Sequence, residues 1–216
     1  MNVKYQQIQK LIVHPALIGL VATSGIVGSL VVNSAFSTQA IAKQVVAPDV
    51  HKPIPPDATA YRSRWGFSFG YSLNSVAIEE KIAARTNNAN SLLGTIDVWT
   101  QEHAQKIRNG AYEGGSEYPA NIRITVYNNR RKLPLQKWIK QSNQFVATGG
   151  FKNTQIAGRN GLKFTSSGLY ENEHVAFVKP KDSRIIVVTL SKSGASNNDS
   201  NYQIAYQFLL DSFSFN

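Results

Sequence analysis

The sequence predicts an α+β sandwich in which helices pack on an antiparallel-rich β-sheet. Segments with the two-residue apolar alternation of strands outnumber the helical patterns. Most connections between these segments are too short to hold a crossover helix, so neighbouring strands are expected to run antiparallel. Apolar residues make up 42% of the 216 residues and charged residues 17%, which is typical of a globular chain with a full core.

Six segments carry the strand pattern. The third of them, for example, places Ile122, Ile124 and Val126 on one face, because successive side chains of a strand point to opposite sides. The run 185–188 is apolar at every position, which indicates a central strand covered on both faces. The six expected strands are residues 65–71, 93–99, 121–127, 162–166, 175–178 and 184–190.

Two reversals are expected between the later strands. Asn160-Gly161, within residues 157–161, is a dipeptide typical of a tight hairpin turn. Residues 180–183, with the sequence Pro-Lys-Asp-Ser, form a short polar loop between the last two strands. Both loops would connect strands that are neighbours in the sheet.

Two helices complete the domain. Pro134 suits the first turn of a helix, because its missing N–H would have no partner there in any case. Leu135, Trp138 and Ile139 then share one face of that helix, so Trp138 is expected in the core. The second helix is expected over residues 200–211, where apolar residues recur at helical spacing.

Residues 1–42 are expected to direct the chain out of the cytoplasm. They contain no acidic residue, and Lys4 and Lys10 precede an uncharged apolar run. Ala40-Ile41-Ala42 then has the small-x-small pattern of a signal-peptidase site, which favours a cleaved signal peptide. An uncleaved membrane anchor is the alternative, because residues 15–36 are long enough to span a bilayer as a helix. With either interpretation the rest of the chain lies outside the cytoplasm.

A linker and a single domain follow this segment. Residues 43–64 contain four prolines and no apolar periodicity, so they are expected to form a stiff, extended linker. Residues 65–216 hold all the strand and helix patterns and form the domain. The chain has no cysteine, which excludes disulfides, thiolate metal sites and a catalytic thiol.

The positive charge of the chain is concentrated in one interval. The sequence has 23 Lys and Arg residues against 13 Asp and Glu residues, but no acid occurs between Glu117 and Glu171. Nine bases lie in that interval, whereas the rest of the chain after residue 42 is close to neutral. A basic surface of this kind attracts acidic partners over a distance, and salt screens the attraction. The candidate partner-binding residues are Arg123, Arg130, Arg131, Lys132, Lys137 and Lys140.

No motif for catalysis, metal binding or a cofactor is present in the sequence. Phosphate-binding loops, dinucleotide fingerprints and a nucleophile elbow are all missing. Only His103 and His174 lie in the domain, and no serine is marked as their partner. Glu171, Glu173 and His174 form the densest ligand-like cluster, but in a strand His174 would point away from the two carboxylates. No catalytic residue, metal or cofactor is therefore expected.

Several core motifs occur in an order that is familiar from one protein family. An aromatic first strand is followed by Ile-Arg-Ile-Thr-Val-Tyr at 122–127 and Leu-Gln-Lys-Trp-Ile at 135–139. Gly-Leu-Lys-Phe at 161–164 and Phe-Leu-Leu-Asp-Ser-Phe-Ser-Phe at 208–215 come next. This order resembles the PsbP-like family of exported proteins. The resemblance implies an antiparallel sheet between helices and a cyanobacterial origin. It transfers no functional residue, because the motifs consist of core aromatics and turn glycines.

These observations together predict a non-catalytic extracytoplasmic accessory or binding protein in the periplasm or thylakoid lumen. The family's best-known member is a lumenal subunit of photosystem II, so the resemblance implies an acidic membrane-protein complex, such as a photosystem, as the partner. An anionic membrane surface is the alternative partner, and export argues against nucleic acid. A small-ligand carrier that uses the open face of the sheet and a hydrolase with dispersed acids are the competing functions. A basic surface that serves only solubility is the simplest alternative.

Overall fold

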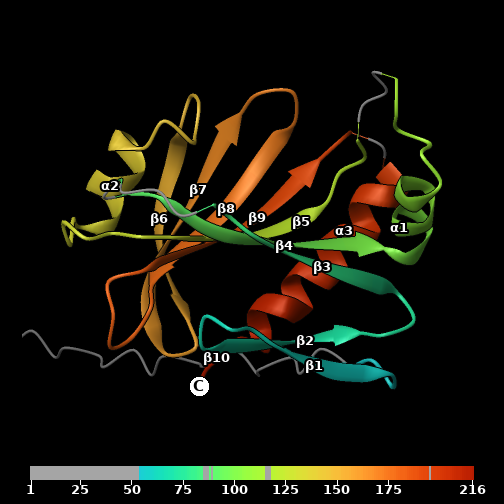
Figure 1. The fold of residues 1–216 in the computed structure, drawn as a ribbon, viewed down its shortest axis with the longest axis horizontal. Coiled ribbons are helices and arrows are strands. Elements are labelled where there is room, and N and C mark those ends of the chain that lie inside the picture. The colour runs from blue at the N-terminus through green and yellow to red at the C-terminus, as the bar shows by residue number, and fades with distance from the viewer. Residues whose placement is uncertain (1–53, 85–87, 89, 115–117, 195) are drawn as a thin grey trace, which may run out of the picture. The chain divides into compact units, whose positions relative to one another are not determined.

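Two antiparallel sheets organise the computed structural model, which describes residues 54–84, 88, 90–114, 118–194 and 196–216 (Figure 1). The larger sheet has seven strands in the order β3-β4-β5-β9-β8-β7-β6, and the smaller has three in the order β1-β2-β10. Every strand pair is antiparallel. The predicted α+β class and its central antiparallel sheet are therefore confirmed.

The strands are spread along the whole described chain. In chain order they are β1 Ala58–Arg62, β2 Phe67–Ser72, β3 Val76–Ile82, β4 Leu92–Thr100, β5 Ile122–Tyr127, β6 Gly149–Ile156, β7 Arg159–Ser167, β8 Glu171–Val178, β9 Ile185–Lys192 and β10 Ser214–Phe215. The helices are α1 Gln101–Arg108, α2 Leu135–Gln141 and α3 Ser196–Asp211.

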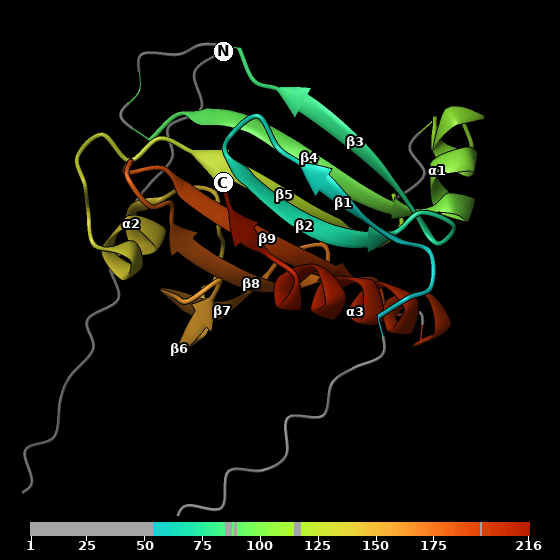
Figure 2. The same cartoon turned by 90° about the horizontal axis from the view of Figure 1, so that it is seen from below.

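The two faces of the larger sheet carry separate cores. The long helix α3 and the smaller sheet cover one face, where Phe67, Ile124 and Val188 belong to the main cluster (Figure 2). Helix α2 covers part of the other face, where Trp138 and Phe164 belong to a second cluster. Strand β9 contributes alternate residues to both clusters, as expected for a run that is apolar at every position. The prediction of a central strand at 185–188 is confirmed, since β9 pairs with β5 and β8.

The predicted helices are both present, and a third helix follows β4. Pro134 immediately precedes α2, and Trp138 is fully buried, as predicted. Helix α3 begins four residues before the expected position 200. Helix α1 was not predicted. It begins after Thr100, whose side chain accepts a hydrogen bond from the backbone N–H of His103 at 3.2 Å. This cap satisfies one of the free N–H groups at the helix start.

The start of the folded part and one turn differ from the prediction, and four strands lie outside the six expected segments: β1, β3, β6 and β10. The expected linker 43–64 contains β1, so the folded part begins before residue 65. Strand β1 was missed because its side chains are mostly exposed and its backbone pairs with β2 alone. The hairpin between β6 and β7 turns at Ala157-Gly158, both with positive φ, rather than at Asn160-Gly161. Gly161 lies inside β7, where an added Cβ would come within 2.9 Å of the Ala176 carbonyl oxygen. A glycine is therefore required at position 161 because the backbone of β8 comes close to it, and not because the chain turns there.

The expected targeting segment 1–42 lies outside the described residues. In the part of the chain that the structure describes, no helix is both long and apolar enough to cross a membrane.

Candidate docking surface

The turn between β5 and α2 holds three of the predicted bases in a fixed shape. Asn129 is buried at its centre and bonds Leu133 twice, since its side-chain oxygen accepts from the Leu133 N–H and its amide donates to the Leu133 carbonyl, both at 3.0 Å. Lys132 takes a positive φ of 50° so that the chain can reverse. Arg130, Arg131 and Lys132 are all exposed on this braced turn.

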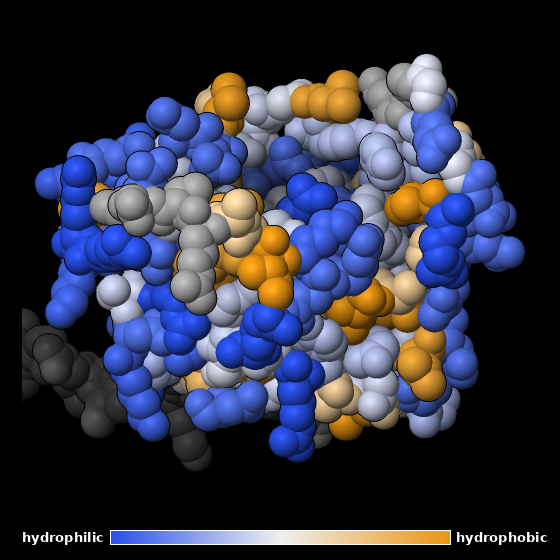
Figure 3. Space-filling view, in the orientation of Figure 1, coloured by the Kyte–Doolittle hydropathy of each residue, from blue (hydrophilic) through white to orange (hydrophobic). Residues whose placement is uncertain are grey.

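Helix α2 continues the same surface. Lys137 and Lys140 are exposed on the side opposite the buried Trp138, as the helical spacing predicted. The Lys140 ammonium lies over the ring of Phe151, 5.6 Å from its centroid. Within the residues that the structure describes, no acid forms an ion pair with any of the five bases of this turn and helix. Their charge is therefore available to a partner, and Figure 3 shows strongly hydrophilic surface on the side where Figure 1 places α2.

Strand pairing adds further bases to this end of the larger sheet. Tyr127 at the end of β5 pairs with Ile185 at the start of β9, so the 128–133 turn lies beside the β8–β9 hairpin (Figure 1). The hairpin between β6 and β7 turns at the same end, because Gly161 pairs with Phe177 near the end of β8. These two hairpins bring four more bases to the end of the sheet: Arg159, Lys179, Lys181 and Arg184.

We call these three loops, with α2, the basic end. The loops are residues 128–134, 157–159 and 179–184, and they contain seven bases and one acid, Asp182. Only Arg123, the first loop and α2 were predicted for the docking surface, because the other bases are distant along the chain. Antiparallel register is the signal that would have joined them, since hairpins at one sheet end return to the same edge.

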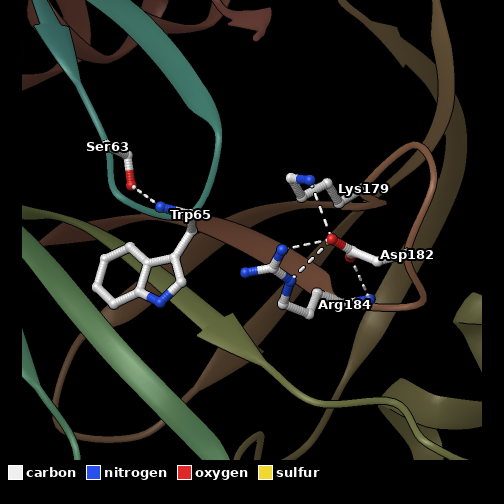
Figure 4. Close-up of polar contacts among 5 residues, drawn as sticks. All are labelled: Ser63, Trp65, Lys179, Asp182 and Arg184. Atoms are coloured by element: carbon white, nitrogen blue, oxygen red, sulfur yellow. Dashed lines mark hydrogen bonds and ion pairs between the residues drawn. The ribbon is translucent and has the colours of Figure 1, made fainter.

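Asp182 is shared between two of these bases (Figure 4). Its Oδ2 accepts hydrogen bonds from Lys179 Nζ and Arg184 Nε, each at 2.9 Å. Burial alone would raise the pKa of Asp182, but the hydrogen bonds from Arg184 and Lys179 outweigh burial and lower the pKa to about 2. One carboxylate thus fixes two cations, and the hairpin keeps a net positive charge. Figure 4 also shows the nearby β1–β2 turn, where the Trp65 N–H donates to Ser63 Oγ at 3.1 Å.

Arg123 lies apart from the other five predicted residues. It is four residues before Tyr127 along β5, which corresponds to about 13 Å of strand. Its Nε donates to Oδ1 of the buried Asp97 at 2.6 Å, so its charge is largely compensated. The structure therefore brings together Arg130, Arg131, Lys132, Lys137 and Lys140 and does not bring Arg123 to them.

The histidines of the domain are structural in their contacts. His174 is buried between Ser166, whose Oγ lies 2.7 Å from Nε2, and Thr189, whose Oγ1 lies 2.9 Å from Nδ1. Burial lowers the pKa of His174 to about 4, so the ring is neutral at physiological pH. Ser166 is itself buried, and a threonine occupies the position that an orienting acid has in a catalytic triad. His103 Nδ1 lies 2.9 Å from the Tyr202 hydroxyl in a similarly buried position.

The side chains of the predicted ligand-like cluster do not meet at one point; its members are Glu171, Glu173 and His174. Glu173 pairs with Lys163 and Lys192 on the face opposite His174, as strand alternation predicted. Burial would raise the pKa of Glu173, but hydrogen bonds from Lys192 and Lys163 lower it. Among the described residues no group of three or more His, Cys, Asp and Glu side chains could hold a metal ion.

Solved structures of other proteins resemble this chain. No family model and no curated protein sequence matches the chain. The solution structure of cyanobacterial PsbP (CyanoP) from Synechocystis sp. PCC 6803 matches with a TM-score of 0.42 and 8% sequence identity. The match covers 76% of this chain and 95% of that chain.

Proposed function

We propose that this protein is a non-catalytic, extracytoplasmic binding protein that docks to an acidic membrane-protein complex through the basic end. The observation that carries this proposal is a set of exposed bases on a braced turn and helix that form no ion pair with an acid among the described residues: Arg130, Arg131, Lys132, Lys137 and Lys140. Arginine offers a rigid donor fork that suits carboxylates, and lysine adds longer-range attraction.

The fixed geometry of the surface favours a protein partner over a lipid surface. Asn129 holds the first loop, and Asp182 holds the β8–β9 loop through Lys179 and Arg184. Bases held at fixed spacings recognise acidic groups that are also held at fixed spacings. An anionic bilayer presents mobile headgroups and requires only net positive charge.

The test is a charge reversal with a matched control. Arg130→Glu combined with Arg131→Glu should reduce association of the full chain with membranes from its source by at least tenfold at low salt. Lys106→Glu combined with Arg108→Glu makes the same change of charge on α1, at the other end of β4, and should leave association nearly unchanged. The melting temperature should hardly move in either variant, because exposed charges contribute little to folding.

Two further measurements separate the possible outcomes. Association should fall steeply with added salt and should be lost when membrane proteins are removed by protease. Equal binding to protein-free vesicles of anionic lipid would show that the partner is the lipid surface. Unchanged association of the double variant at low salt would reduce the basic end to a role in solubility.

A further inference from the structure

A pocket opens on the same face of the larger sheet as α2, over the part of that face that α2 does not cover. Its volume is about 650 Å³, which is within the range of small-molecule sites. Arg123 lies in its floor, on the same face of β5 as Tyr127, whose ring packs against Trp138 of α2. Figure 3 shows that this side of the molecule is hollowed below its upper edge. The basic end does not use this pocket.

The floor of the pocket has balanced charge. Glu79 and Lys81 of β3 form an ion pair of 3.3 Å, and Arg123 pairs with Asp97 of β4 at 2.6 Å. Among the described residues that line the pocket, two acids and two bases therefore cancel, and the floor favours neither an anion nor a cation. The expected ligand is polar and uncharged.

Hydrogen-bonding groups of the floor are left open. Asp97 is 1% exposed, and its Oδ2 accepts no hydrogen bond from the residues that the structure describes. Lys81 Nζ lies 4.0 Å from that oxygen, which is too far for a hydrogen bond. Arg123 uses its Nε, and no hydrogen bond joins its terminal amino groups to another described residue. A buried acceptor and a free donor fork thus lie side by side, which suits adjacent hydroxyl groups of one ligand.

The walls of the pocket are aromatic and apolar. Tyr118 is half exposed, and its ring lies 6.2 Å from that of the buried Trp99 and 5.6 Å from that of Tyr112. Tyr170, in the β7–β8 turn, donates a hydrogen bond to the Tyr118 carbonyl and also lines the pocket. An exposed ring held by other rings is a firm surface for the flat C–H face of a ligand.

We propose that this pocket binds a small neutral saccharide. Such a ligand combines adjacent hydroxyls, which would bond to Asp97 and Arg123, with a C–H face, which would lie on Tyr118. This activity is independent of the proposed docking, because none of the residues that line the pocket belongs to the basic end.

The experiment screens the full chain against an array of neutral, acidic and amino mono- to tetrasaccharides. The best neutral saccharide is then titrated by calorimetry. Tyr118→Ala and Asp97→Asn should each weaken binding at least tenfold, the second because an amide nitrogen would replace the free acceptor. Ile204→Ala, which removes an exposed apolar side chain from α3, should bind as the wild type does. The exposed position of Tyr118 keeps the test valid even where Asp97→Asn impairs folding.

Three outcomes would overturn the proposal. One is that no neutral saccharide binds at about 10 mM, which would place any Kd above the millimolar range. Another is that only acidic or amino sugars bind, which would contradict the balanced charge of the floor. The third is that Tyr118→Ala and Ile204→Ala bind equally well, which would place the ligand elsewhere.

Discussion

Trp138 provides the most direct test of how the second core is held. Its side chain is fully buried, and its ring centroid lies 5.0 Å from that of Tyr127 and 6.3 Å from that of Phe145. Truncation of Trp138 to alanine removes the largest side chain of that cluster and leaves a cavity under α2. We expect Trp138→Ala to lower the free energy of unfolding by about 3–5 kcal/mol.

A second substitution at the same position separates packing from hydrogen bonding. The indole Nε1 of Trp138 has no hydrogen-bond partner among the described residues. Trp138→Phe keeps most of the ring contacts and removes this unpaired donor, so we expect it to cost less than about 1.5 kcal/mol. If Nε1 did form a hydrogen bond, Trp138→Phe would lower the free energy of unfolding nearly as much as Trp138→Ala.

Urea unfolding followed by circular dichroism measures both variants. The midpoint should shift while the denaturant slope stays constant, because the unfolded surface changes little. A loss below about 1 kcal/mol for Trp138→Ala would refute the reasoning, since a well-packed buried ring cannot be removed at that cost. Trp138 would then belong to a surface, and a binding role for α2 through its ring would have to be considered.

Three further changes test separate parts of the structure. Gly94→Ala should destabilise the domain by about 1–3 kcal/mol in urea, because its Cβ would lie 2.4 Å from the Trp65 ring, whereas Gly168→Ala has open space and should be neutral. Thr100→Ala should cost about 1 kcal/mol through the lost cap of α1, and Thr100→Ser should restore it; equal melting temperatures would exclude the cap. Burial lowers the pKa of His174 from 6.5 to about 4, so the unfolded chain binds more protons between these values and stability should fall as the pH falls from 6.5 to 4. His174→Gln should flatten that part of the pH–stability curve. An unchanged curve would show that His174 does not cause the pH dependence.

Helices and strands are well predicted where the pattern of buried side chains is regular along the chain. The run 185–188 is apolar at every position because β9 separates two cores, and the Pro134 start of α2 follows from its missing N–H. Strand β1 gave no such signal, since pairing with β2 satisfies its backbone while its side chains stay mostly exposed. Helix α1 was missed for a related reason, because only His103 and Ala104 of its eight residues are buried.

The candidate site was only partly predictable for a different reason. Arg130 to Lys140 are close in sequence, so charge counting located them together. Arg159 and Lys181 join them only through strand register, which the sequence does not state. Arg123 shares the acid-free interval but faces Asp97, a residue 26 positions earlier in the chain. Charge along a sequence does not reveal which charges are already compensated in space.

The smaller sheet has a consequence for how the chain is made. Its strand β10 pairs with β2, and Ser214 Oγ lies 2.8 Å from Ser68 Oγ across 146 positions of sequence. Contacts of such long range form late, because the loop between them must be closed first. During synthesis from the N-terminus, Phe67 and Phe69 therefore have no Phe213 to pack against until nearly all of the described chain has emerged. The smaller sheet can therefore be completed only at the end of synthesis, and until then these aromatic side chains lack part of their packing.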